Sequence, residues 1–93
     1  MQVRFYRDPQ TGLPHIYGHS VAEQEVEDVL ASPGEDRVGR EGSRVALGQT
    51  RAGRHLRVVY VPETEGAYVI TAYELTGKAL VAYRRRRRGR RRS

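Results

Sequence analysis

Two apolar runs in the second half of the chain constrain its fold more than any other feature. Residues 55–61 and 67–73 are rich in Val, Tyr, Ile and Thr, and the five residues 62–66 join them. Such residues favour the pleated surface of a sheet, and the short connection favours a hairpin. Side chains alternate between the two faces of a strand, and neither face is purely polar here. The runs therefore predict an antiparallel hairpin at the centre of a sheet, covered by helix on one side.

Alternation along each run also predicts which side chains share a face of the sheet. In the first run, Leu56, Val58 and Tyr60 fall together. In the second run, strict alternation separates two sets, which are Tyr68, Ile70 and Ala72 on one face and Val69, Thr71 and Tyr73 on the other.

One helix is predicted with well-defined ends at residues 20–32. Ser20 and Glu23 have the spacing of a capping box, and Pro33 with Gly34 ends the segment. Its apolar positions follow helical spacing, and they are Ala22, Val26, Val29 and Leu30. The helix should pack on the hairpin with Val26 and Leu30 buried.

The remaining segments complete an α+β order. Residues 1–7 favour an edge strand, residues 35–43 a polar loop, and residues 44–49 a strand with Val45 and Leu47 turned inward. A second helix begins near Thr76 and reaches Tyr83. We expect a single domain over residues 1–83, with a small antiparallel sheet of three to four strands, a helix packed on one face and a C-terminal helix. Residues 84–93 form an arginine-rich tail, for which both a continued helix and a disordered segment are open.

The charge of the chain divides into two parts. The net charge is +6, and eight arginines lie in the last ten residues. The nine basic and eleven acidic residues that remain give the body a net charge of −2. Sixteen of the 17 basic residues are arginine, whose planar fork of donors suits phosphate better than a lysine ammonium does. A basic tail of this kind favours nucleic acid or an acidic partner.

Composition excludes several classes of function. Cysteine is absent, which rules out disulfides, thiolate metal ligands and a thiol nucleophile. No apolar run approaches the ~20 residues of a membrane span, and no signal-peptide core follows Met1. His15 and His19 lie four residues apart but before the predicted helix, and no third ligand is evident. We expect a cytoplasmic protein without membrane contact, bound metal or cofactor.

Several motifs together resemble a known family. They include His15-x3-His19-Ser20, an acidic helix, Leu47-Gly48, the run GRHLRVVY at residues 53–60, and Ile70-Thr71-Ala72 followed by Tyr83. This pattern, which covers most of the chain, resembles the BrnT-like branch of the RelE/ParE toxin superfamily. It is also similar to a sister group of small toxin-like domains without established activity. Tyr73 stands where the family usually has Arg, and Ala79-Leu80 where it usually has Glu-Arg.

The resemblance implies a bacterial toxin of a type II toxin–antitoxin pair, an endoribonuclease that acts on messenger RNA, in some members on the ribosome. Its protein partner would be an antitoxin that covers the basic face. Cleavage needs cations at the reacting phosphate and groups that transfer protons. The candidate catalytic residues are Arg54, Tyr83, Lys78 and His19. The candidate RNA-binding residues are Arg44, Arg51, Arg54, Arg84, Arg85, Arg86, Arg87 and Arg88.

Two other functions remain open from the sequence. A non-catalytic RNA- or nucleic-acid-binding module would use the same arginines without cleavage. A structural interaction domain would use them as a solvated face that pairs with acidic groups. His19 in that case would order the beginning of the helix, and Tyr83 would pack under the C-terminal helix.

Overall fold

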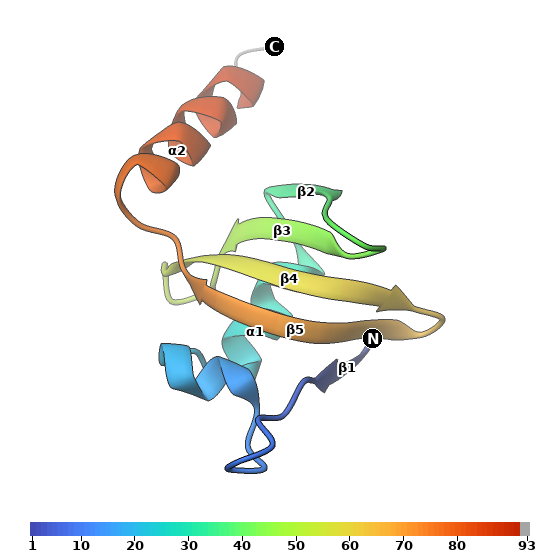
Figure 1. Cartoon of the computed structure of the whole chain (residues 1–93). Helices are drawn as coiled ribbons and strands as arrows, with labels where there is room; N and C mark the ends of the chain where they lie inside the picture. Colours follow the sequence, from blue (N-terminus) through green and yellow to red (C-terminus); the bar gives the residue numbers. More distant parts are fainter. Residues whose placement is uncertain (92–93) are drawn as a thin grey trace.

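The computed structural model describes residues 1–91 and places a five-stranded sheet at the centre of the chain (Figure 1). The strands are β1 (Gln2–Phe5), β2 (Glu35–Val38), β3 (Arg44–Gln49), β4 (His55–Glu63) and β5 (Gly66–Glu74). The helices are the 3-10 helix η1 (His15–His19) and the α-helices α1 (Glu23–Ala31) and α2 (Gly77–Arg91). The strand order is β1-β5-β4-β3-β2, with β1 parallel to β5 and every other pair antiparallel.

The predicted central hairpin is confirmed, and both of its strands are longer than the apolar runs. β4 and β5 pair from Leu56 with Glu74 to Glu63 with Gly66. Gly66 sits directly against the backbone of Gln2, where any side chain would overlap it. This close approach lets β1 add to β5 as a parallel edge strand, so the sheet is mixed where an antiparallel one was expected.

Helix α1 packs on one face of the sheet, called here the first face (Figure 1). Val26 and Val29 are fully buried there against Leu56 and Val58, and Leu30 is half-buried at the margin. The capping box predicted from Ser20 and Glu23 is wrong. Ser20 takes a left-handed conformation at the end of η1, and the Ala22 N–H donates to the Glu25 carboxylate at 3.0 Å.

The opposite face of the sheet, called the second face, is covered at one end by the beginning of α2. Val45 and Leu47 are buried there with Leu75 and Tyr83, so they point inward, but away from α1. The face alternation predicted for β5 is wrong. The register shifts at Val59/Tyr60, and beyond it Ala67 and Val69 are buried where Tyr68 was expected. An extra residue at such a bulge reverses the face of every position on one side of it.

The loop predicted at residues 35–43 is wrong in its first half, because β2 forms there. Polar residues rarely favour a strand, yet tertiary contacts override that preference. Asp36 accepts hydrogen bonds from the Tyr60 hydroxyl at 2.5 Å and from Arg44 at 2.9 Å. Glu35 is bound by Arg86 from α2. The sheet therefore has five strands, one more than the largest number expected.

The arginines of the predicted tail continue α2 as far as Arg91. Of the predicted tail, residues 92–93 lie outside the described residues. Within the described part of the chain, no helix is long and apolar enough to cross a membrane.

Gly34 controls how α2 docks, because a Cβ at this position would overlap the Tyr83 hydroxyl. Gly34→Ala should displace Tyr83 and destabilise the fold by about 1–3 kcal/mol, the usual effect of overpacking. Urea unfolding measures this change. The control is Gly18→Ala, where nothing lies within 4 Å of the added methyl group. Equal stability of the two variants would contradict the proposed docking.

Candidate nucleic-acid interface

A pocket of about 280 Å³ opens between the second face of the sheet and α2. It is the place where arginines of α2 meet side chains of the body. Its lining consists of Ser32, Gly34, Gln49, His55, Tyr83, Arg84, Arg87 and Arg88. Three of these eight residues are arginines, and none is acidic, so the pocket favours an anion.

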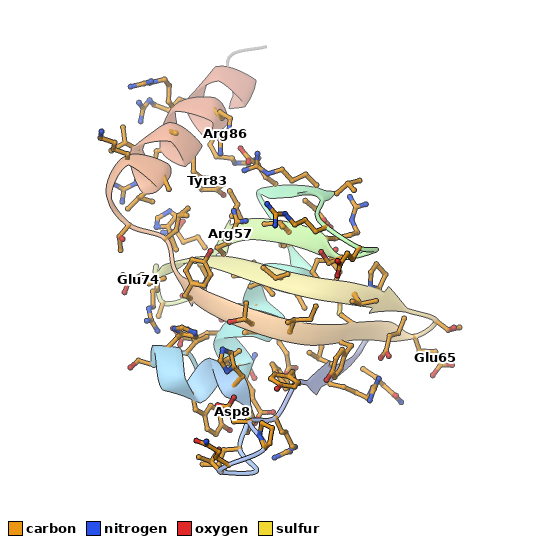
Figure 2. All side chains as sticks on the ribbon, in the orientation of Figure 1. Asp8, Arg57, Glu65, Glu74, Tyr83 and Arg86 are labelled. Atoms are coloured by element: carbon orange, nitrogen blue, oxygen red, sulfur yellow. The ribbon has the colours of Figure 1, made fainter. Side chains whose placement is uncertain are left out.

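The buried side chain of Tyr83 anchors α2 to the second face of the sheet. Its side chain is 5% exposed and packs with Val45 and Leu47 of β3. Its ring also meets His55 edge to face, with 5.8 Å between the ring centroids. Contacts on several sides leave the ring little freedom, so Tyr83 sets the position of the arginines that follow it (Figure 2).

Two arginines of α2 bind the body directly. Arg86 donates from Nε and Nη2 to the two carboxylate oxygens of Glu35, and the second contact measures 3.0 Å. This pairing raises the pKa of the Arg86 guanidinium. Arg87 donates to the Gly34 carbonyl oxygen at 2.9 Å. Such forked, charge-assisted contacts give α2 a defined orientation on the sheet.

The other arginines of this part of α2 are left unpaired. Arg84, Arg85 and Arg88 are exposed and make no hydrogen bond or ion pair with the described residues. Holding three cations close together without counterions is unfavourable in isolation. They are therefore available to bind an external anion, and two of them line the pocket.

His55 is a titratable residue of the body that lines the pocket together with Arg84 and Arg88. Burial, and then the positive charge of Arg84, lower the pKa of the His55 imidazole. Both causes disfavour the protonated ring, so His55 is neutral at neutral pH. A neutral imidazole can accept a proton or donate a hydrogen bond inside the pocket. The sequence analysis missed His55, although alternation along β4 places it on the face opposite to Arg54 and Leu56.

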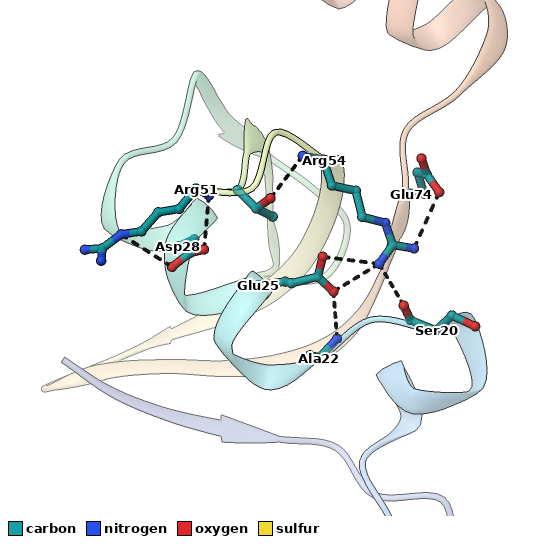
Figure 3. A network of polar contacts seen from close by, with 8 residues as sticks. Ser20, Ala22, Glu25, Asp28, Arg51, Arg54 and Glu74 are labelled. Carbon is teal, nitrogen blue, oxygen red and sulfur yellow. Dashed lines mark hydrogen bonds and ion pairs between the residues drawn. The ribbon is translucent and has the colours of Figure 1, made fainter.

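Arg54, a predicted catalytic residue, lies on the first face instead. Its guanidinium donates to the Ser20 carbonyl oxygen at 2.7 Å and to Glu25 at 3.0 Å, and it reaches Glu74 at 3.5 Å (Figure 3). These partners belong to the end of η1, the start of α1 and the end of β5. Arg54 thus ties α1 to the central hairpin and is not a member of the pocket lining.

Arg51 and Arg44 also lie outside the pocket. The Arg51 backbone N–H donates to Asp28 at 3.1 Å and lowers the pKa of that carboxyl, while the Arg51 side chain is 93% exposed (Figure 3). Arg44 pairs with Asp36 at 2.9 Å, which joins β3 to β2. Arg44 therefore has a close partner within the chain, whereas the exposed Arg51 side chain makes only a long ion pair, with 4.0 Å between its Nε and the Asp28 carboxylate.

Lys78 and His19 complete the predicted set. Lys78 is exposed in the first turn of α2 and is not part of the pocket lining. His19 ends η1, where its ring centroid lies 5.2 Å from that of His15 and 6.0 Å from that of Tyr73. The fold thus brings Tyr83 together with Arg84, Arg87 and Arg88, and it places the other predicted catalytic residues elsewhere.

Metal chemistry has no support from the described side chains. His15 pairs with Asp8 at 2.8 Å, and its ring stacks against His19. Among residues 1–91, no three His, Cys, Asp or Glu side chains are grouped so that they could hold a metal ion.

These features define a small α+β domain with a mixed sheet and a basic C-terminal helix. The chain belongs to the family described as domain of unknown function DUF4258, whose model matches residues 19–74, more than half of the sequence. The match extends from the end of η1 to the end of β5 and excludes α2. Comparisons with curated proteins and with solved structures gave no match.

The environment of His55 predicts its titration. Its imidazole should titrate below the ordinary value of about 6.5, and Arg84→Gln should move the titration upward because a like charge is removed. Since the folded-state pKa is the lower one, this group stabilises the fold above about pH 6.5, and that contribution is lost as the pH falls through the folded-state pKa. NMR of the His55 imidazole protons at a series of pH values measures the titration. Titration of His55 at or above 6.5 would contradict this account.

Proposed function

We propose that the protein binds RNA through α2 and the adjoining pocket. The observation that carries this proposal is the fixed orientation of α2. Tyr83, Arg86 and Arg87 hold the helix, while Arg84, Arg85 and Arg88 remain unpaired. Unpaired arginines in a row supply phosphate contacts with little reorganisation. The pocket beside them adds the edges of His55 and Tyr83, which could contact a base or a sugar.

Binding should depend on salt in proportion to the number of phosphates that are neutralised. For single strands, each contact contributes a slope of about −0.7 in a plot of log affinity against log salt. The variant with Arg84, Arg85 and Arg88 all changed to Gln should therefore flatten the slope by about 2. Fluorescence anisotropy with a labelled RNA oligonucleotide at several salt concentrations measures the slope.

The matched control for this experiment is Arg51→Gln. Arg51 has the more exposed side chain and lies outside the pocket. Its replacement should leave the slope nearly unchanged, because it removes no cation of the proposed surface. A flattening of about 0.7, one third of that in the triple variant, would show that net charge alone governs binding, and the proposed surface would then be wrong.

A second candidate function is a toxin of a bacterial toxin–antitoxin pair that cleaves messenger RNA in the cytoplasm, on the ribosome or free. The specific observation that favours it is the position of neutral His55 beside the Tyr83 ring and the pocket arginines. RNA cleavage requires a proton acceptor at the 2′-hydroxyl, a proton donor at the leaving oxygen, and cations at the phosphate. The pocket contains all three types of group, and an antitoxin would act by covering it.

The cleavage hypothesis predicts distinct effects for two kinds of variant. His55→Gln should lower single-turnover cleavage of a long transcript at saturating RNA by on the order of 100-fold, as the loss of a general base does, and weaken RNA binding by a much smaller factor. Arg54→Met should lower stability instead, because its partners lie in α1 and β5. The assay needs purified protein, with and without ribosomes, and growth of a host that expresses the chain. If the wild type does not cleave RNA, RNA binding is the one of the two functions that remains. Cleavage by His55→Gln at the rate of the wild type would exclude His55 as the general base.

A further inference from the structure

A second basic surface lies at the other end of the second face, around β2. It is a groove of about 430 Å³. Three arginines and three valines form most of its lining, and they are Arg37, Arg40, Arg57, Val38, Val45 and Val59. No carboxylate is part of the lining, and no residue of α2 contributes to it. Arg37 pairs with Glu35 at 3.4 Å, whereas Arg40 and Arg57 form no ion pair with a described carboxylate.

Arg57 carries the one buried side-chain nitrogen or oxygen atom of the described residues that has no hydrogen-bond partner. This atom is the guanidinium Nε. The residue sits in the middle of the sheet, between Leu47 of β3 and Tyr73 of β5, on the side toward α2 (Figure 2). A buried cationic donor without an acceptor is unfavourable, and an ordered water, a bound anion or a functional role accounts for such a group in native proteins. An anion bound in the groove would remove this cost.

The groove also adjoins an open strand edge. β2 is the last strand of the sheet, and only β3 pairs with it among the described strands. Val38, at its end, is 77% exposed. An edge strand with an exposed apolar side chain is a template for the addition of a further strand.

We propose that the β2 edge and this groove bind an extended acidic segment of a partner protein, which adds to the sheet as a sixth strand. Register determines the pattern of that segment. Arg37 pairs with Val45 and projects on the second face, whereas Val38 pairs with Arg44 and projects on the first. Residues of the bound segment that project on the second face therefore meet arginines, and those that project on the first face meet Val38. The segment should accordingly carry carboxylates that alternate with aliphatic side chains.

Other occupants fit this surface less well. A second copy of the chain would present the four carboxylates of its helix α1, and a helix cannot add to the sheet as a strand. Three of the four are also bound within the same molecule, since Glu25 is bound by Arg54, Glu23 by Tyr17 and Asp28 by Arg51. RNA would find no aromatic ring in the lining on which a base could stack. The groove thus serves a protein partner and is separate from the RNA surface proposed for α2.

A synthetic peptide tests the proposal on the full chain. The probe is a labelled octapeptide of alternating Glu and Val with blocked ends, and its partner probe has Gln at every Glu position. The wild type should bind the Glu peptide at least about tenfold more tightly than the Gln peptide, because the Arg57 donor gains a charged acceptor. N-methylation of alternate backbone amides should also abolish binding, since strand addition requires them. Equal binding of the Glu and Gln peptides, or no binding of the Glu peptide, would overturn the proposal.

Matched variants separate this site from the RNA surface. Arg57→Met keeps the apolar stem in place, and Arg40→Gln changes an exposed turn residue. Each variant should weaken binding of the Glu peptide by about fivefold or more and leave RNA affinity unchanged. Arg85→Gln, on α2, should weaken RNA binding and leave the affinity for the Glu peptide unchanged. If Arg57→Met loses RNA affinity and keeps its peptide affinity, the groove binds RNA. If sedimentation shows that the wild type forms a dimer and Arg57→Met does not, the groove serves self-association. Either result would overturn the proposal.

Discussion

The central strand β4 has to bury side chains on both of its faces, and the rest of the structure follows from this requirement. Leu56 and Val58 are fully buried under α1 on the first face. Val59 packs on the second face against the cluster that includes Leu47 and Tyr83. A chain of 93 residues cannot form two large cores, so it covers the second face only at one end. The pocket lies at that covered end, between the sheet and α2, whereas no residue of α2 lines the groove.

The position of α2 depends on a small number of contacts with the Pro33–Gly34–Glu35 corner. The missing side chain at Gly34 admits the Tyr83 ring, its carbonyl accepts from Arg87, and Glu35 binds Arg86. The same corner ends α1 and begins β2. Helix α1, strand β2 and helix α2 therefore meet at one place. This contact gives α2 a fixed direction despite the repulsion among its arginines.

Arginine has two separate uses in this molecule. Arg44, Arg54 and Arg86 each bind a carboxylate from a different element and hold the fold together. Arg40, Arg57 and Arg84 have no such partner among the described residues. Composition cannot separate these groups, since both consist of the same residue type. The partners that distinguish them come from 8 to 51 positions away along the chain.

The sequence by itself determined the central hairpin, the helix that carries Val26, and the first strand at an edge of the sheet. Each depends on local periodicity, which a chain expresses without distant contacts. Only the tertiary structure decided the parallel pairing of β1, the presence of β2 and the bulge in β5. These features depend on close approach at Gly66, on ion pairs from α2, and on a register shift that no local pattern records. Among the candidate residues, Tyr83 and its following arginines were predictable because they share one helix. Strand alternation puts His55 and Arg54 on opposite faces of β4, but only the docking of α2 on the second face decided that His55, and not Arg54, lies beside the arginines of that helix.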